Sequence, residues 1–166
     1  MNKKMIMTSL TLGLIAASSA ALIGLTNLIT RKQISANADK KINAGIVDIY
    51  GKNASISQKS SINDVEDNAK YKYVEYVYDV QDENDIRLGY AFQTTGSNMY
   101  GKVSLIVGFS LETSKFKGLS IVINEQTYAS TLVNNYIIPL NNGNRELSDV
   151  SCGATYGATL VKDMVN

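Results

Sequence analysis

An uncharged and largely apolar stretch, Met5–Ile29, constrains the fold of this chain more than any other feature of its sequence. Its 25 residues would form a helix about 37 Å long, enough to cross a hydrocarbon core of roughly 30 Å. A cleaved signal peptide is the alternative, because Lys3 and Lys4 precede the stretch and Ser18-Ser19-Ala20 would serve as a cleavage site. The apolar run continues through Leu25, well beyond that site. We therefore expect a membrane anchor.

Small residues recur at four-residue spacing along the expected anchor, in the rows Gly13, Ala17, Ala21 and Ala16, Ala20, Gly24. Such rows allow a second helix to approach closely in lipid. One interpretation is a partner helix in a membrane complex, and the other is that Ala and Gly are simply common in membrane helices. Basic residues flank both ends of the stretch, so the positive-inside rule does not choose an orientation.

The 136 residues that follow, 31–166, are enough for one domain with a real core. Their 14 basic and 15 acidic side chains nearly balance, and no basic patch with interleaved aromatic residues suggests nucleic-acid binding. The single cysteine rules out an internal disulfide. The absence of histidine removes His-based triads, His-ligated haem and most zinc sites. We expect no metal site and no catalytic residue, and we interpret Cys152 as a small, partly buried apolar residue.

Apolar periodicity and turn residues divide this region into elements. They predict a helix over 30–50, a polar loop over 53–61 and a short helix or turn at 61–66. They predict antiparallel strands at 71–80, 87–94, 102–111 and 116–124, with turns at 81–85 and 95–98 and a tight hairpin at 112–115. They predict a helix over 125–136 ended by Pro139, a polar loop over 140–147 and a terminal helix opened by Thr155.

These patterns predict an α+β protein, in which an N-terminal transmembrane helix precedes one domain with a twisted antiparallel sheet flanked by helices. We divide the chain into a transmembrane anchor (1–30), a connecting helix and loop (31–60) and a folded domain (61–166).

The most informative motif is the run from Asp149 to Thr155, Asp-Val-Ser-Cys-Gly-Ala-Thr. Gly153 and Ala154 carry almost no side chain, so a bulky group can approach the backbone there. Thr155 is a good helix N-cap, and a phosphate at that position would meet free backbone N–H groups and the positive end of the helix dipole. The motif therefore permits a phosphorylated or phosphoester-bearing Thr155. An ordinary glycine turn that precedes a helix is the simpler interpretation.

The motif resembles the attachment sequence Asp-x-x-(Ser/Thr)-Gly-Ala-Thr of covalent FMN-binding domains, which occur in the G-type component of Rnf complexes and the C-type component of sodium-pumping NADH:quinone oxidoreductases. In that family a flavin transferase uses FAD and Mg²⁺ to join FMN to the last Thr by a phosphoester. The resemblance implies that Thr155 bears FMN. Asp149, Gly153 and Ala154 occupy matching positions, and Cys152 stands where the family has Ser or Thr.

The resemblance covers the anchor and most of the domain. The family has a Glu-Thr-Pro-Gly loop near the flavin, and Asn124–Thr127 stands in its place here. Thr127 matches and is a candidate flavin contact, whereas the Pro and the Gly are missing. The tyrosines of 71–80 suggest either a flavin-stacking patch or, as we favour, the edge of a twisted sheet. Asp149 either caps a turn or is recognised by the transferase.

Together these features predict a membrane-anchored electron-transfer subunit with a cytoplasmic N-terminus and its flavin domain on the outer face. The resemblance implies membrane subunits of a ferredoxin- or NADH-oxidising complex that pumps Na⁺ or H⁺ as partners, and a flavin transferase for maturation. Such a subunit would catalyse nothing alone. Two alternatives remain: an anchored flavoprotein that passes electrons to a quinone or an external acceptor outside any pump, and a flavin-free extracytoplasmic binding domain.

Overall fold

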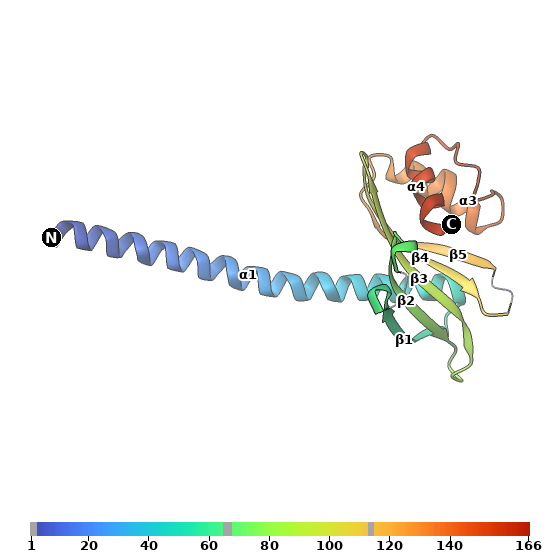
Figure 1. Ribbon diagram of the computed structural model, residues 1–166, viewed down its shortest axis with the longest axis horizontal. Helices are drawn as coiled ribbons and strands as arrows, with labels where there is room; N and C mark the ends of the chain where they lie inside the picture. The colour runs from blue at the N-terminus through green and yellow to red at the C-terminus, as the bar shows by residue number, and fades with distance from the viewer. Residues whose placement is uncertain (1–2, 65–67, 113–114) are drawn as a thin grey trace. The chain divides into compact units, whose positions relative to one another are not determined.

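The computed structural model describes residues 3–64, 68–112 and 115–166 (Figure 1). Its elements in chain order are α1 (Lys3–Tyr50), β1 (Ser55–Ser61), the short 3₁₀ turns η1 (Ile62–Asp64) and η2 (Asn68–Lys70), β2 (Val74–Gln81), β3 (Arg87–Asn98), β4 (Gly101–Ser110), β5 (Phe116–Asn124), α2 (Ala129–Leu132), the π-helical turn η3 (Val133–Ile137), α3 (Ile138–Asn141) and α4 (Thr155–Val165). The chain divides into two compact units, Met1–Asp39 and Lys40–Asn166.

The first unit is helical, and its described side chains are almost all exposed. Among the residues that the structure describes, α1 is the one helix long and apolar enough to cross a membrane, by length and composition. Its polar side chains bond to the helix itself: Ser18 and Ser19 each donate a hydroxyl to a carbonyl four residues back at 2.9 Å, and Thr26 does so at 2.8 Å. Such bonds satisfy hydroxyl groups in a medium that offers no water.

The second unit contains a five-stranded sheet in the order β1-β2-β3-β4-β5, in which every neighbouring pair is antiparallel. The α+β class and the four predicted strands are confirmed. The predicted loop over 53–61 is wrong, because Ser55–Ser61 forms β1 and pairs with β2 from Ser55↔Gln81 to Ser61↔Tyr76. A strand at the edge of a sheet pairs with one neighbour only and keeps more of its surface in solvent, so a polar sequence is tolerated there. Since β1 and β5 are the edges, the interpretation of the tyrosine-rich segment as an edge is also wrong.

The predicted turn at 95–98 is wrong too, because β3 continues to Asn98 and pairs with Gly101. Gly96 lies within this strand and serves packing. A Cβ at this position would lie 2.9 Å from Leu160 Cδ1 and 3.0 Å from Met164 Sδ, so the ends of these two flexible side chains, both from α4, would have to move aside. The predicted hairpin at 112–115 falls partly on residues outside the described ranges, and so does the helix or turn predicted at 61–66.

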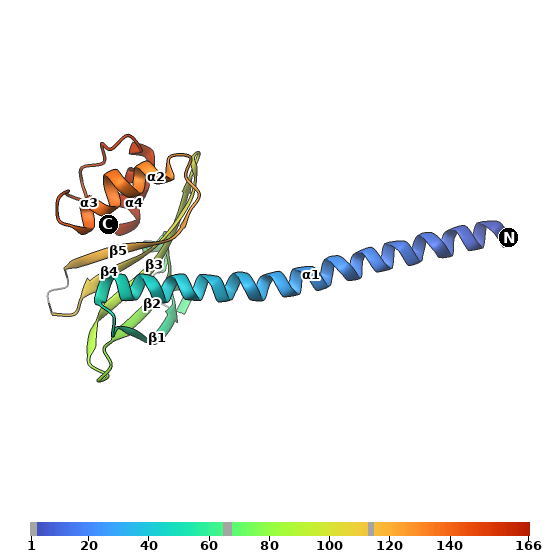
Figure 2. The same ribbon diagram turned by 180° about the vertical axis from the view of Figure 1, so that it is seen from behind.

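Each face of the sheet is covered by helices, and the two faces hold separate hydrophobic clusters (Figure 2). On one face, Ile42 and Ile46 from the end of α1 pack against Val80, Ala91, Ile106 and Val122. On the other face, Val103, Leu105 and Val107 of β4 pack against Leu132, Tyr136, Ala158 and Val161 from the C-terminal helices. Side chains alternate along a strand, so β4 contributes to both clusters and lies at the centre of the domain.

Tyr50, the last residue of α1, fastens the helix to the sheet. Its hydroxyl accepts the Phe109 N–H at 3.0 Å and lies 2.7 Å from the Tyr90 carbonyl oxygen. Gly108 makes this approach possible, because a Cβ there would lie 2.5 Å from Ile49 Cγ2 and 3.0 Å from Tyr50 Cε2. The hydroxyl thus joins β3 and β4 where Tyr90 and Phe109 face each other.

The helical segment after β5 begins at Ala129 rather than at 125 and passes through Pro139 rather than ending before it. A proline inside a regular α-helix clashes with the carbonyl four residues back. Here the Ile138 N–H donates to the carbonyl of Val133, five residues back, so the helix is widened just before the proline. The segment therefore continues to Asn141, whose side-chain amide bonds both the N–H of Leu119 at 2.9 Å and its carbonyl at 2.7 Å.

We predict that Tyr50→Phe lowers the free energy of unfolding by about 1–3 kcal/mol, because it leaves a partly buried Phe109 N–H without an acceptor. Denaturant unfolding of the detergent-solubilised chain, followed by near-ultraviolet circular dichroism, measures this. Tyr71→Phe, at an exposed tyrosine, is the control and should leave the midpoint unchanged. Equal midpoints for Tyr50→Phe and the wild type would contradict the fastening role.

The same bond predicts a pH dependence. Burial raises the pKa of Tyr50 from 10.0 to about 12, against a lowering by its bond to Phe109. A raised pKa in the folded state stabilises the protein below pH 10 and ceases to do so as the pH approaches 12. The stability difference between the wild type and Tyr50→Phe should therefore shrink between pH 10 and 12. A stability difference that stays constant between pH 10 and 12 would show that burial does not raise the pKa of the Tyr50 phenol.

Candidate functional site

The motif residues lie in the loop that leads into α4 and at the start of that helix. Gly153 has a φ of +82°, a left-handed conformation that favours glycine, and a Cβ there would lie 3.4 Å from Thr131 Cγ2. Ala154 follows as the N-cap, with its side chain buried, and its carbonyl accepts the Ala158 N–H at 3.0 Å. The left-handed turn therefore directs the chain into α4.

Thr155 is the first residue of α4 and not its N-cap, which corrects the sequence-based expectation. The reason is the Gly153 turn, which brings the helix to its first turn one residue earlier than a threonine cap would. No side chain caps the helix, so N–H groups of its first turn remain available to a ligand. The Thr155 side chain is exposed and, within the described part of the chain, its hydroxyl has no protein partner.

Thr159, the other threonine of α4, differs in this respect. Its hydroxyl donates to the Thr155 carbonyl at 2.9 Å, four residues back along the helix. A hydroxyl that bonds its own helix is less available for modification. Thr155 is therefore the better placed of the two.

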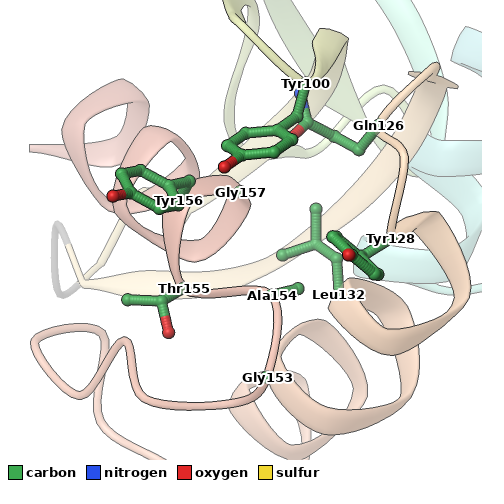
Figure 3. Close-up of a pocket in the computed structure, with 9 residues that line it drawn as sticks. All are labelled: Tyr100, Gln126, Tyr128, Leu132, Gly153, Ala154, Thr155, Tyr156 and Gly157. Atoms are coloured by element: carbon green, nitrogen blue, oxygen red, sulfur yellow. The ribbon is translucent and has the colours of Figure 1, made fainter.

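A pocket of about 270 Å³ lies beside the start of α4 (Figure 3). It is lined by Tyr100, Gln126, Tyr128, Leu132, Gly153, Ala154, Thr155, Tyr156 and Gly157. The Tyr100 ring centroid lies 5.2 Å from that of Tyr156 and 6.4 Å from that of Tyr128. Gly157 keeps the floor open, since a Cβ there would lie 3.1 Å from Leu132 Cδ2. The pocket thus presents aromatic rings to a flat apolar ligand.

Sequence reasoning missed most of these lining residues. Tyr156 adjoins the motif, but Tyr100 comes from the β3–β4 turn and Gln126 and Tyr128 from the segment after β5. Gln126 holds this part together, because its buried side-chain amide donates to Asn98 Oδ1 at 3.1 Å and to the Gly101 carbonyl. Each of these two segments contains a single tyrosine, Tyr100 or Tyr128, and no pattern in the sequence relates either of them to the motif.

Thr127, the predicted flavin contact, is exposed and is not among the residues that line the pocket. Its N–H donates to the Tyr100 carbonyl at 2.9 Å, and its hydroxyl lies 3.3 Å from the same oxygen. Thr127 therefore braces Tyr100. The tyrosines of β2 do not line the pocket either. Tyr78 is buried in the cluster on the sheet's other face, and the Tyr76 ring centroid lies 4.0 Å from Lys59 Nζ.

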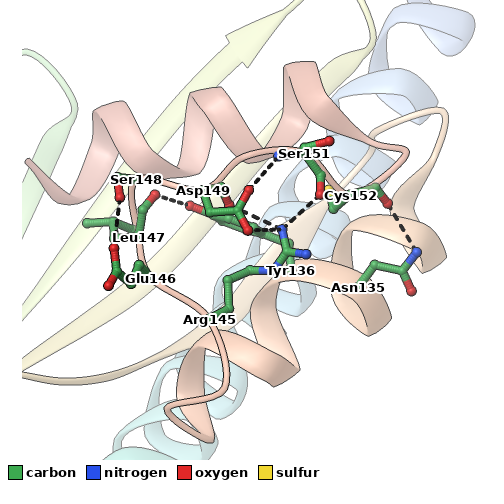
Figure 4. A network of polar contacts seen from close by, with 9 residues as sticks. All are labelled: Asn135, Tyr136, Arg145, Glu146, Leu147, Ser148, Asp149, Ser151 and Cys152. Carbon is green, nitrogen blue, oxygen red and sulfur yellow. Dashed lines mark hydrogen bonds and ion pairs between the residues drawn. The ribbon is translucent and has the colours of Figure 1, made fainter.

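Asp149 and Cys152 lie in the loop before α4 (Figure 4). Asp149 Oδ1 accepts the Ser151 N–H at 3.2 Å, so the carboxylate does cap a turn, yet 57% of its side chain is exposed. Cys152 is 8% exposed and belongs to the hydrophobic cluster, as predicted. Among the described residues, no group of three or more His, Cys, Asp or Glu side chains would hold a metal ion.

Side chains of the preceding helical segment hold this loop. Burial raises the pKa of Tyr136 to about 12, with smaller contributions from Cys152 and Asp149 and an opposing one from Arg145. The phenol therefore remains protonated and donates to the Leu147 carbonyl at 2.7 Å. The loop thus has a fixed shape where it approaches the motif.

Comparison with known proteins concerns the other end of the chain. Residues 1–45 match the family model of the RnfG N-terminal region. The match ends before β1, so it does not extend to the motif or to the pocket. No curated protein matches the chain. The N-terminal part of this chain, which forms most of the long apolar helix α1, is therefore similar to the N-terminal region of the RnfG component of Rnf complexes.

Proposed function

We propose that Thr155 carries FMN through a phosphoester and that the chain is an electron-transfer subunit of an ion-translocating ferredoxin or NADH oxidoreductase complex. The observation that carries the proposal is an exposed hydroxyl, unpartnered within the described residues, on the first residue of an uncapped helix beside a tyrosine-lined pocket.

The residues present fit both parts of FMN. The phosphate would lie at the start of α4, where free N–H groups and the helix dipole stabilise an anion. The turn at Gly153 leaves that approach open, since a glycine there carries no side chain. The isoalloxazine ring would find the aromatic surfaces of Tyr100, Tyr128 and Tyr156. A volume of about 270 Å³ accommodates part of the cofactor and leaves the rest accessible to redox partners.

The chain supplies attachment, position and electrostatics. In the attachment reaction the Thr155 hydroxyl oxygen forms a bond to the FMN phosphorus of FAD, the pyrophosphate bond breaks, AMP leaves, and the hydroxyl proton passes to solvent or to the transferase. Bound FMN accepts and releases one or two electrons. A covalent bond prevents dilution of the cofactor outside the cell, and the anchor keeps it close to its partners.

The family match supports membership of a multi-subunit Rnf complex. By resemblance, the N-terminus lies in the cytoplasm and the flavin domain on the outer face, with a flavin transferase as the maturation partner. The donor chain would begin with ferredoxin or NADH, and the complex would move Na⁺ or H⁺. The subunit itself would serve as a carrier between the redox centres of its neighbours.

One observation favours a flavin-free binding domain as the second candidate. Tyr100 and Tyr156 already contact each other at 5.2 Å, and Thr127 braces Tyr100 instead of facing the pocket. The Tyr100 and Tyr156 rings therefore pack against each other without a ligand between them. Direct tests of flavin attachment separate the two functions.

We predict that co-expression with an active flavin transferase yields a fluorescent band at the mass of this chain in a denaturing gel, and that Thr155→Val abolishes it. Valine keeps the shape of threonine but lacks the hydroxyl that forms the ester. Thr159→Val is the matched control and should load like the wild type. Loss of the band only in Thr159→Val would show that the ester forms on the other threonine, and no band in the wild type would end the flavin proposal.

We predict that Asp149→Ala lowers flavin loading several-fold while the chain stays folded. Its carboxylate is largely exposed and can contact an enzyme, so its loss removes a recognition group as well as the turn contact to Ser151. Glu146→Ala, a nearby carboxylate in the same loop, is the control. Mass spectrometry of the intact chain gives the loaded fraction. Equal fractions for Asp149→Ala and the wild type would show that loading needs neither the Asp149 carboxylate nor its contact to Ser151.

A further inference from the structure

The loop 142–154 is held by side-chain donors along its length (Figure 4). The Tyr136 hydroxyl donates to the Leu147 carbonyl at 2.7 Å, and Asn135 Nδ2 donates to the Cys152 carbonyl at 3.0 Å. Between them, Arg145 Nη1 donates to the carbonyls of Asp149 and Ser151, each at 3.1 Å. Four loop carbonyls are therefore fixed by three side chains.

Arg145 is the charged member of this set and the one that closes a turn. By bonding two carbonyls two residues apart, it draws the backbone at Asp149 and Ser151 together. The Asp149 carboxylate lies 3.7 Å from the same nitrogen and accepts the Ser151 N–H, so the turn is closed from both sides. The Arg145 side chain is only 18% exposed, and its guanidinium lies 5.7 Å from the Tyr136 ring centroid. Packing against the Tyr136 ring therefore helps to hold the guanidinium in place.

This closed turn ends two residues before Gly153, whose left-handed conformation directs the chain into α4. Without the Arg145 bonds, the loop would sample several conformations. Only a fraction of the chains would then present Thr155 in the conformation seen here at any moment. The apparent affinity of a partner that needs that shape falls by the same fraction.

We propose that Arg145 is a positioning residue for the modification of Thr155: it holds the loop in the shape that the flavin transferase binds. This inference rests on the proposed function, and it adds a residue outside the attachment motif. Arg145 does not touch the ester or the reacting atoms. Its effect is transmitted through the Asp149–Ser151 turn.

The test compares flavin loading of the full-length, detergent-solubilised chain by purified transferase with FAD and Mg²⁺. Arg145→Met keeps much of the side-chain volume and removes the donors. We expect its KM to rise about tenfold with kcat nearly unchanged, since only a minor fraction of the chains would hold the required shape. We expect Arg145→Lys to fall between Arg145→Met and the wild type. Arg87→Met is the control, because Arg87 pairs with Asp79 on the sheet, and it should load like the wild type.

Hydrogen exchange of the same unmodified proteins provides a readout that does not depend on flavin. Arg145→Met should lose protection over residues 147–152, while the amides of β3 and β4 stay protected as in the wild type. Unchanged loop protection, or an unchanged kcat/KM, overturns the role of Arg145 alone. A wild-type chain that takes no flavin overturns the proposed function instead, and the role of Arg145 with it.

Discussion

The two-sided burial of β4 is the constraint on which the rest of this domain depends. Leu105 and Val107 point to the C-terminal helices and Ile106 points to the end of α1, and all three are almost completely buried. The apolar side chains of one strand therefore order the helices on both faces of the sheet. Burial of each large apolar side chain contributes roughly 1.5–3 kcal/mol. The C-terminal helices can hold Thr155 at the surface only because their other faces are committed to β4.

Much of the fold follows from the sequence. The uncharged run 5–29 and the apolar spacing after it predict α1, and dense β-branched and aromatic residues predict β2 to β5. The errors arise where tertiary contacts outweigh local preference. β1 has a polar sequence and forms because β2 offers it a pairing edge. Gly96 suggests a turn, but it serves the seating of α4, and Pro139 suggests a helix end, but a π-helical turn absorbs it.

The candidate site was predictable in part. The motif indicates Thr155, and the structure places this residue at an uncapped helix end. The pocket could not be predicted, because Tyr100, Tyr128 and Tyr156 come from three separate segments that only the folded sheet brings together. Thr127 was assigned by its position in a family loop, yet its contacts depend on the course of the backbone, and they lead to Tyr100. Short motifs specify chemistry, whereas long-range packing specifies the surroundings.

The glycine at position 96 has a consequence for α4 as a whole. Leu160 and Met164, from the second half of the helix, rest directly on it. A helix of 11 residues moves as a stiff rod, and tightly packed interiors transmit strain. An alanine at residue 96 would displace the flexible ends of Leu160 and Met164, and these two side chains belong to the helix that begins at Thr155. The interior of the sheet and the exposed threonine are thus linked through a single helix.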